Sequence, residues 1–175
     1  VEGAVFRDDG AGAGVPNDGA PQAGESGLGN VRVRATSGAC AGGACDSTLT
    51  DGGGAFALWL PAATAGGGVS VSETNSNAWI STGGSAGTTG GTYARSTDAL
   101  DFVPANGVVY SGVAFGDVPP NQLAAPGVRT APAGGAAFHP HTFVAGSAGT
   151  VSFSAVQTPV PPLPGWSGTL VRALD

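Results

Sequence analysis

The sequence has 175 residues, of which 32 are Gly, 13 are Pro and only 10% are charged. A helix interior tolerates Gly and Pro least, so this composition excludes a helical bundle, and an apolar fraction of 41% in short alternating runs argues against a disordered chain. A net charge of −6 offers no attraction to nucleic acid or an anionic membrane, and no apolar run approaches the roughly 20 residues that span a bilayer.

Short runs of alternating apolar and polar residues are separated by turn residues, which is the pattern of a sandwich or barrel. The clearest run is residues 30–36, where Val33 would face the core and Arg32 and Arg34 the solvent. The pattern therefore predicts an all-β fold. Further strands of the first part of the chain are predicted at residues 1–7, 46–50, 55–60, 69–73, 79–80, 100–103 and 108–115.

Two long segments are predicted to be loops. Residues 8–29 are rich in Asp, Asn, Gly and Pro, and residues 81–92 are mostly Gly, Ser and Thr with almost nothing to bury. The dipeptide Asn106-Gly107 predicts a hairpin turn between the two strands that flank it.

The two cysteines lie close together, as Cys40-Ala-Gly-Gly-Ala-Cys45. This spacing is too long for a Cys-x-x-Cys redox motif, and the further ligands of a zinc site are missing. We favour a disulfide that clamps the neck of a hairpin over two free thiols, and such a bond implies an oxidising compartment. Closing so short a loop would fix strand register more than it would add stability.

The segment Gly116-Asp-Val-Pro-Pro120 predicts a boundary between one domain at residues 1–118 and a smaller β segment at residues 119–175. So short a segment buries too little surface to offset its chain entropy. We therefore expect it to pack on the first domain or to be completed by a strand from elsewhere. Its predicted strands are residues 136–145, 150–156 and 166–174.

Acidic residues are concentrated near the N-terminus, where the first 25 residues hold five of the 12. Such clustering indicates a cation, and Ca²⁺ binds oxygens of carboxylates, amides and backbone carbonyls. The alternative is a solvated loop in which Asn17 or Asp18 forms an Asx turn. The predicted calcium ligands are Asp8, Asp9, Asn17, Asp18 and Glu25, with Asp51 contributing from a neighbouring turn, while Asp117 is expected to cap a turn.

Several short motifs follow one another along the first 118 residues. They are residues 3–8 (Gly-Ala-Val-Phe-Arg-Asp), Asn17-Asp18, residues 24–28 (Gly-Glu-Ser-Gly-Leu), Val31-Arg32-Val33, residues 50–54 (Thr-Asp-Gly-Gly-Gly), Phe56 and Phe115-Gly116-Asp117. This order resembles the SdrD B-like repeat, one of the Cna B-type, prealbumin-like domains of bacterial surface proteins. The resemblance implies a seven-stranded Greek-key, Ig-like sandwich that binds calcium through its first acidic loop and serves as an extracellular stalk or spacer.

The sequence departs from that family in two places. The first acidic loop carries an insertion at residues 10–16, and the absence of Lys excludes the Lys–Asn isopeptide bond of some Cna B-type domains. The segment after Pro120 resembles the start of an Ig-like repeat, in which Leu-Asp leads into another acidic loop. Because the sequence ends at Leu174-Asp175, we expect this repeat to be truncated or cut for assembly.

Other residues give weaker signals for chemistry. His139 and His141 alternate along one strand and could bind a transition metal, but the chain has no third His. No nucleophile elbow occurs, and a Gly-rich loop is too open to tune a catalytic carboxylate, so we expect no enzyme activity. Aromatic side chains at strand ends could stack on sugars but more often cap a core or anchor an interface; they are Trp59, Trp79 and Trp166.

Together these patterns predict a secreted or cell-surface structural module, rigidified by calcium, that acts as a stalk, spacer or filament subunit. Its expected partners are other copies or neighbouring domains, joined by strand exchange, with no nucleic acid and no membrane span. The alternative is an adhesin-type module that recognises a glycan or a host protein through the loops at residues 10–24 and 81–92.

Overall fold

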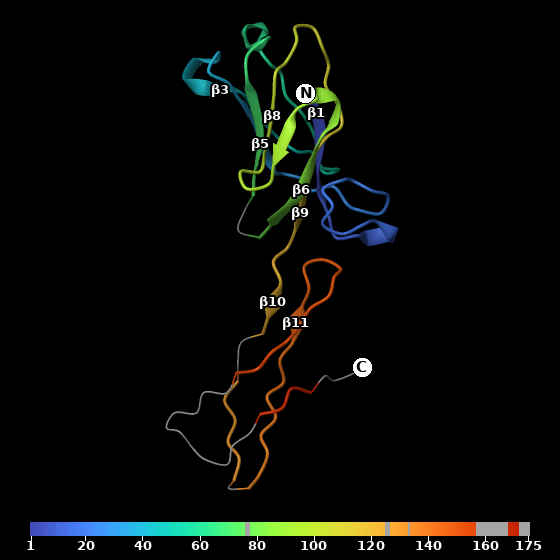
Figure 1. Cartoon of the computed structure of the whole chain (residues 1–175), viewed down its shortest axis with the longest axis vertical. Coiled ribbons are helices and arrows are strands. Elements are labelled where there is room, and N and C mark those ends of the chain that lie inside the picture. The colour runs from blue at the N-terminus through green and yellow to red at the C-terminus, as the bar shows by residue number, and fades with distance from the viewer. Residues whose placement is uncertain (76–77, 125–126, 133, 157–167, 172–175) are drawn as a thin grey trace.

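The computed structural model describes residues 1–75, 78–124, 127–132, 134–156 and 168–171. Its regular elements are β-strands and short 3₁₀ turns, and two sheets pack face to face as a sandwich (Figure 1). The chain then continues from the last sandwich strand into an extended segment that reaches away from the sandwich. The predicted all-β sandwich with a smaller second β segment is confirmed. The 3₁₀ turns are η1 (Ala11–Ala13), η2 (Ala41–Gly43), η3 (Ala62–Thr64) and η4 (Gly87–Thr89).

The first sheet has four strands in the order β4-β1-β9-β6, so no strand lies beside its neighbour in sequence. The first and last strands of the sandwich, β1 and β9, pair in parallel at the centre of this sheet, while β4 pairs antiparallel with β1 and β6 with β9. The parallel pair therefore brings the beginning and the end of the sandwich sequence side by side. The strands are β1 (Glu2–Arg7), β4 (Ala55–Ala57), β6 (Ile80–Ala86) and β9 (Val113–Val118).

The second sheet has five strands in the order β3-β2-β5-β8-β7, all antiparallel. The predicted disulfide between Cys40 and Cys45 is confirmed and closes the loop between β2 and β3, with the two Cα atoms 5.2 Å apart. The strands are β2 (Arg32–Thr36), β3 (Ala44–Leu49), β5 (Val69–Thr74), β7 (Thr92–Ala94) and β8 (Ala99–Phe102).

The core lies between the sheets and follows the alternation of the sequence. On β2, Val33 and Ala35 are buried while Arg32 and Arg34 are exposed, as predicted. At the centre, the ring of Phe115 lies among aromatic neighbours, with centroid distances of 6.2 Å to Phe56 and 6.0 Å to Tyr93. These inward rows hold the two sheets together.

The predicted loop at residues 81–92 is wrong, because its first half belongs to β6, which pairs with β9. Its lack of bulky side chains is a packing requirement: a Cβ on Gly84 would lie 2.6 Å from the Tyr93 ring and 2.7 Å from the Ala114 carbonyl oxygen. Small residues let β6 approach the neighbouring sheet, which a bulky strand could not do.

The predicted hairpin at Asn106-Gly107 is also wrong. The strands on either side of it, β8 and β9, belong to different sheets, so this segment crosses from one layer to the other. Burial explains the crossing, because Leu100 and Phe102 on β8 and Val113 on β9 all point into the core from opposite sides.

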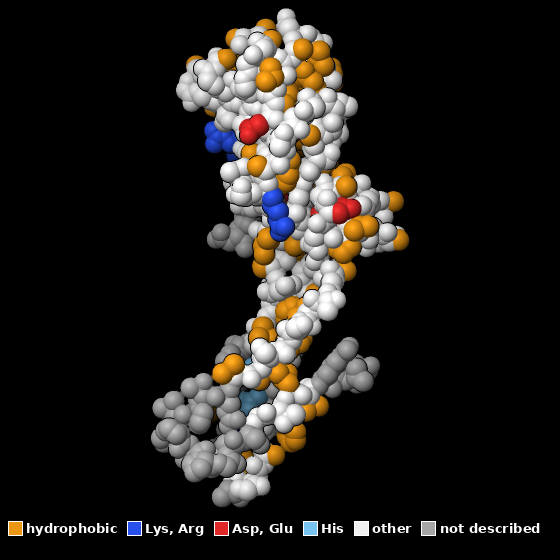
Figure 2. Space-filling model, in the orientation of Figure 1, with side chains coloured by type: hydrophobic (Ala, Val, Ile, Leu, Met, Phe, Trp, Pro, Cys, Tyr) orange, Lys and Arg blue, Asp and Glu red, His pale blue; other side chains and the backbone are white. Residues whose placement is uncertain are grey.

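The C-terminal segment, residues 119–175, is called the arm here. In its described part, β10 (Gln122–Leu123) and β11 (Phe143–Val144) form a two-stranded sheet. Large apolar side chains are spread along its surface (Figure 2). A two-stranded sheet with no second layer is marginal by itself. The exposed large apolar side chains are Leu123, Val128, Phe138, Val144, Val151, Phe153, Val156, Leu170 and Val171.

Candidate metal centre

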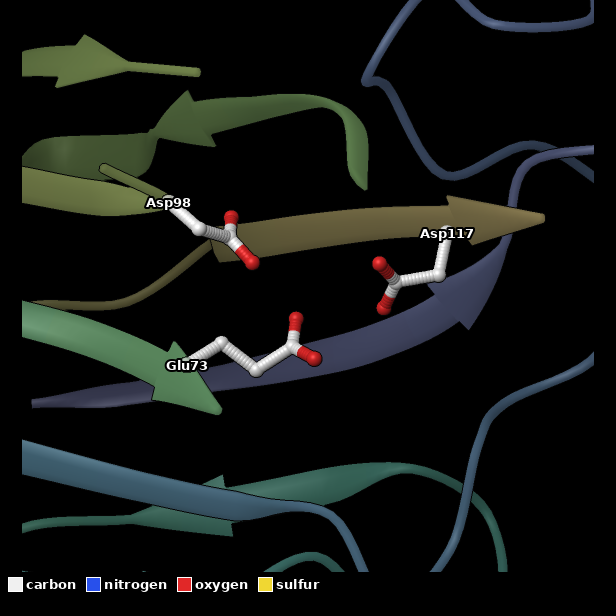
Figure 3. Close-up of side chains that lie close together, drawn as sticks. All are labelled: Glu73, Asp98 and Asp117. Atoms are coloured by element: carbon white, nitrogen blue, oxygen red, sulfur yellow. The ribbon is translucent and has the colours of Figure 1, made fainter. Parts of the chain in front are cut away.

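Three acidic side chains meet between the two sheets, at the end of the sandwich from which the arm departs. Glu73 belongs to β5, Asp98 precedes β8, and Asp117 belongs to β9 of the opposite sheet. Their carboxylates point toward one another (Figure 3), and one oxygen from each lies within 4.8 Å of the others. We call these three residues the acidic cluster.

Strand alternation brings two of these carboxylates inward. On β5, Glu73 follows Val69 and Val71 on the buried face, and on β9, Asp117 follows Phe115 in the same way. On both β5 and β9, the row of side chains that points into the core therefore ends in a carboxylate. This continuation of a buried row into an acidic residue is the sequence signal that could have revealed the cluster.

Asp98 is placed by the turn that leads into β8. Its backbone has φ of 47°, in the left-handed region that Asp and Asn tolerate better than most residues. Its carboxylate accepts three hydrogen bonds, from Tyr93 Oη at 2.8 Å, Asn75 Nδ2 at 3.0 Å and Ser81 Oγ at 3.1 Å. Asp98 is thus held firmly, at a half-buried position.

The other two carboxylates are buried without hydrogen-bond partners. Glu73 is 6% and Asp117 is 1% exposed, and none of their four carboxylate oxygens has a partner among the described residues. Buried polar groups are nearly always paired, and an unpaired one costs free energy. A bound cation would give these oxygens a partner that no described side chain provides.

The pKa values of the three carboxyl groups are all raised, as expected for acidic groups that are buried close together. Burial, together with the negative charge of Asp117, raises the pKa of Glu73 from 4.5 to about 10. Burial also raises the pKa of Asp117 to about 6 and that of Asp98 above its ordinary value. Among the described residues the one ion pair is Arg7 with Asp9, at 2.7 Å, so no basic side chain neutralises the cluster.

An all-oxygen set of carboxylates suits a hard divalent cation such as Ca²⁺, Mg²⁺ or Mn²⁺. A bound cation would favour the charged carboxylates and would tie β5 and β8 of one sheet to β9 of the other. Among the His, Cys, Asp and Glu side chains that the structure describes, only the acidic cluster brings three or more ligand atoms this close.

The carboxylate of Asp8, one of the predicted calcium ligands, is fully buried and accepts hydrogen bonds from within the protein. Its donors are Gly19 N at 2.8 Å, Asp18 N at 3.3 Å and Thr82 Oγ1 at 2.6 Å. Asp8 therefore pins the first acidic loop, residues 8–25, against β6.

The other predicted ligands make local contacts. Asp9 pairs with Arg7, Glu25 accepts hydrogen bonds from Gly10 N and Gln22 N, and Asp51 caps its own turn. Asn17 donates to Ser147 in the arm, and Asp18 accepts from Ala20 N and Gln22 Nε2. Calcium binding in the first acidic loop stays a prediction, as does metal binding by His139 and His141, which are both exposed.

Comparison with known proteins gives no family for this chain: no family model matches the sequence, and no curated protein matches it. Fold and site together define an all-β sandwich with one disulfide and a buried acidic cluster that could hold a metal ion. In the described part of the chain no helix is long and apolar enough to cross a membrane.

Proposed function

We propose that this protein is an extracellular structural module of a bacterial surface assembly, a stalk, spacer or filament subunit, whose sandwich is stiffened by calcium bound at Glu73, Asp98 and Asp117. The observation that carries the proposal is the pair of buried, unpartnered carboxylates of Glu73 and Asp117 aimed at a common point with Asp98.

We favour calcium over other hard cations because its coordination tolerates a wider range of ligand arrangements. Mg²⁺ demands a near-ideal octahedron, whereas Ca²⁺ accepts about six to eight oxygens in flexible arrangements. Asp98 is half-buried, so in this proposal water ligands complete the coordination from its side.

The mechanical role follows from where the ligands lie. An ion that binds the folded cluster and not the unfolded chain stabilises the fold in proportion to the logarithm of its concentration. Since the ligands come from both sheets, the ion would resist separation of the two layers. The disulfide at Cys40–Cys45 supports an oxidising location, and the motif resemblance to SdrD B-like repeats supports the class of module.

Terbium luminescence tests the location of the ion. Tb³⁺ replaces Ca²⁺ at oxygen sites and emits when a nearby aromatic ring transfers energy to it, and the Tyr93 hydroxyl lies 2.8 Å from Asp98 Oδ1. We expect sensitised emission that Ca²⁺ displaces, together with a higher melting temperature in Ca²⁺ than in EDTA.

Matched variants assign the signal to one site. Glu73→Gln and Asp117→Asn should lose the emission and the calcium-dependent gain in melting temperature, whereas Asp18→Asn with Glu25→Gln should keep both. The reverse pattern would place the ion in the first acidic loop. If calcium does not change the melting temperature of the unmodified protein, the proposal is wrong.

A further inference from the structure

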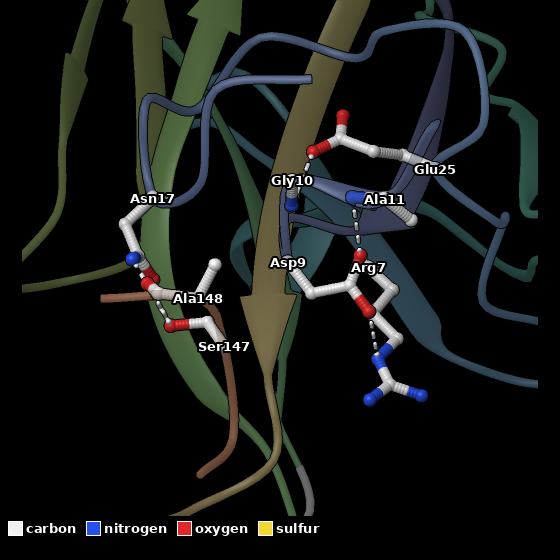
Figure 4. A network of polar contacts seen from close by, with 8 residues as sticks. All are labelled: Arg7, Asp9, Gly10, Ala11, Asn17, Glu25, Ser147 and Ala148. Atoms are coloured by element: carbon white, nitrogen blue, oxygen red, sulfur yellow. Dashed lines mark hydrogen bonds and ion pairs between the residues drawn. The ribbon is translucent and has the colours of Figure 1, made fainter. Parts of the chain in front are cut away.

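The arm leaves the sandwich immediately after β9, yet it touches the sandwich a second time. A turn at residues 146–149, which we call the arm turn, returns to the first acidic loop (Figure 4). There Asn17 Nδ2 donates a hydrogen bond to Ser147 Oγ at 3.1 Å, and the Ala148 N–H points to the Asp9 carbonyl oxygen at 3.5 Å. The two segments are far apart in sequence.

The arm turn is also seated on the root of the arm. Gly146 is buried, and its N–H donates to Asn121 Oδ1 at 2.9 Å. A Cβ at Gly146 would lie only 1.8 Å from the Pro119 carbonyl oxygen, so this position accepts only glycine. The turn is therefore held between the root of the arm on one side and the first acidic loop on the other.

Asp8 connects this contact to the acidic cluster. Its N–H donates to the carbonyl oxygen of Asp117 at 2.9 Å, and its own carbonyl oxygen accepts from Asn17 N at 3.2 Å. Its carboxylate holds the N–H groups of Asp18 and Gly19. Asp117, a member of the acidic cluster, and Asn17, which contacts the arm, are thus both hydrogen-bonded to one buried residue, Asp8.

We propose that the first acidic loop is a brace that fixes the direction of the arm, and that a cation at the acidic cluster tightens this brace through Asp8. The second half of this inference rests on the function proposed above. The brace matters because the described arm is paired by only two short strands and has no second layer of its own. Without the contact at the arm turn, the arm would pivot at its root.

Distances between spin labels on the full chain measure the direction of the arm. Labels on cysteines introduced at Thr97 in the sandwich and Val128 in the arm, both exposed, are attached without reductant, so that the Cys40–Cys45 bridge stays closed. We expect a narrow distance distribution in calcium. The paired change Asn17→Ala and Ser147→Ala should broaden it, while Asn106→Ala, an exposed change in the segment between β8 and β9, should not. An unchanged distribution in the paired variant would overturn the brace.

Chelation separates the brace from the cation site. In EDTA the unmodified protein should shift to a broader distribution, and Glu73→Gln should be broad with and without calcium. If calcium raises the melting temperature and Tb³⁺ binds, but the distribution stays the same in EDTA, the coupling through Asp8 is wrong while the cation site stands. If neither Tb³⁺ nor Ca²⁺ binds the cluster, the proposed function fails and the coupling fails with it.

Discussion

The hydroxyl of Thr82 on β6 donates a 2.6 Å hydrogen bond to the carboxylate of Asp8, which directly follows β1. The same hydroxyl lies 2.8 Å from the carbonyl oxygen of Gly116 on β9. One buried side chain therefore joins β6, β9 and the start of the first acidic loop. This bond anchors the loop that contacts the arm.

Removing that hydroxyl should weaken the fold. Thr82→Val keeps the volume but leaves the buried Asp8 with only its two backbone donors, and we expect a loss of about 1–3 kcal/mol in the free energy of unfolding. Urea denaturation measures it. Thr92→Val, an exposed change on β7, is the matched control and should alter stability little. Equal stability of the two variants would contradict the role given to Thr82.

Neutralising Glu73 should stabilise the metal-free protein and remove its response to calcium. In EDTA near neutral pH, Glu73→Gln should raise the melting temperature, because the folded protein no longer has to keep a carboxyl protonated that the unfolded chain would ionise. Adding calcium should not raise the melting temperature of the variant further, since one of the proposed ligands is lost. Asp101→Asn, an exposed change on β8, should leave the calcium response intact. Differential scanning calorimetry in both buffers provides the comparison.

Stability of the metal-free protein should fall as pH rises. Folding raises the pKa of Glu73 from 4.5 to about 10 and that of Asp117 from 3.8 to about 6. The folded state therefore holds protons that the unfolded chain releases across this window, so the free energy of unfolding decreases from about pH 4 to about pH 10. Melting temperatures in EDTA across this range test the slope. Glu73→Gln should flatten it above about pH 6, and a rising curve would contradict the pKa shifts.

Removing the disulfide should lower stability without preventing folding. Cys40 and Cys45 are separated by only five positions, and closing so short a loop is worth about 2 kcal/mol in the chain-entropy model. The paired change Cys40→Ser and Cys45→Ser should therefore lower the free energy of unfolding by about that amount while the protein still folds. Guanidinium denaturation of the two proteins checks the difference. Failure of the double variant to fold would show that the bridge does more than close the loop.

The predicted strands that the structure confirms are those whose side chains alternate clearly. The alternation of Arg32 and Arg34 with Val33 and Ala35 predicted both the strand and its buried face. Beyond the strand predicted at residues 79–80, β6 was missed because its glycines carry no apolar signal, although the close approach of Gly84 to Tyr93 requires a small residue there. The hairpin at Asn106-Gly107 was wrong because a local turn signal says nothing about which sheet each flanking strand joins.

The candidate metal site was missed for a related reason. Sequence reasoning chose carboxylates that are neighbours along the chain, such as Asp8 and Asp18, because proximity in sequence is the only proximity it can observe. Glu73, Asp98 and Asp117 come from distant segments and meet only when the sheets close.

By itself, the sequence determined the all-β class, the disulfide and the buried face of each clear strand, because these depend on residue type and on a period of two along the backbone. The tertiary structure alone decided strand order, the pairing of β1 with β9, the contact between Asn17 and Ser147, and the meeting of three carboxylates. Alternation fixes whether a side chain points inward, but only the packing of one sheet on the other fixes what it meets there.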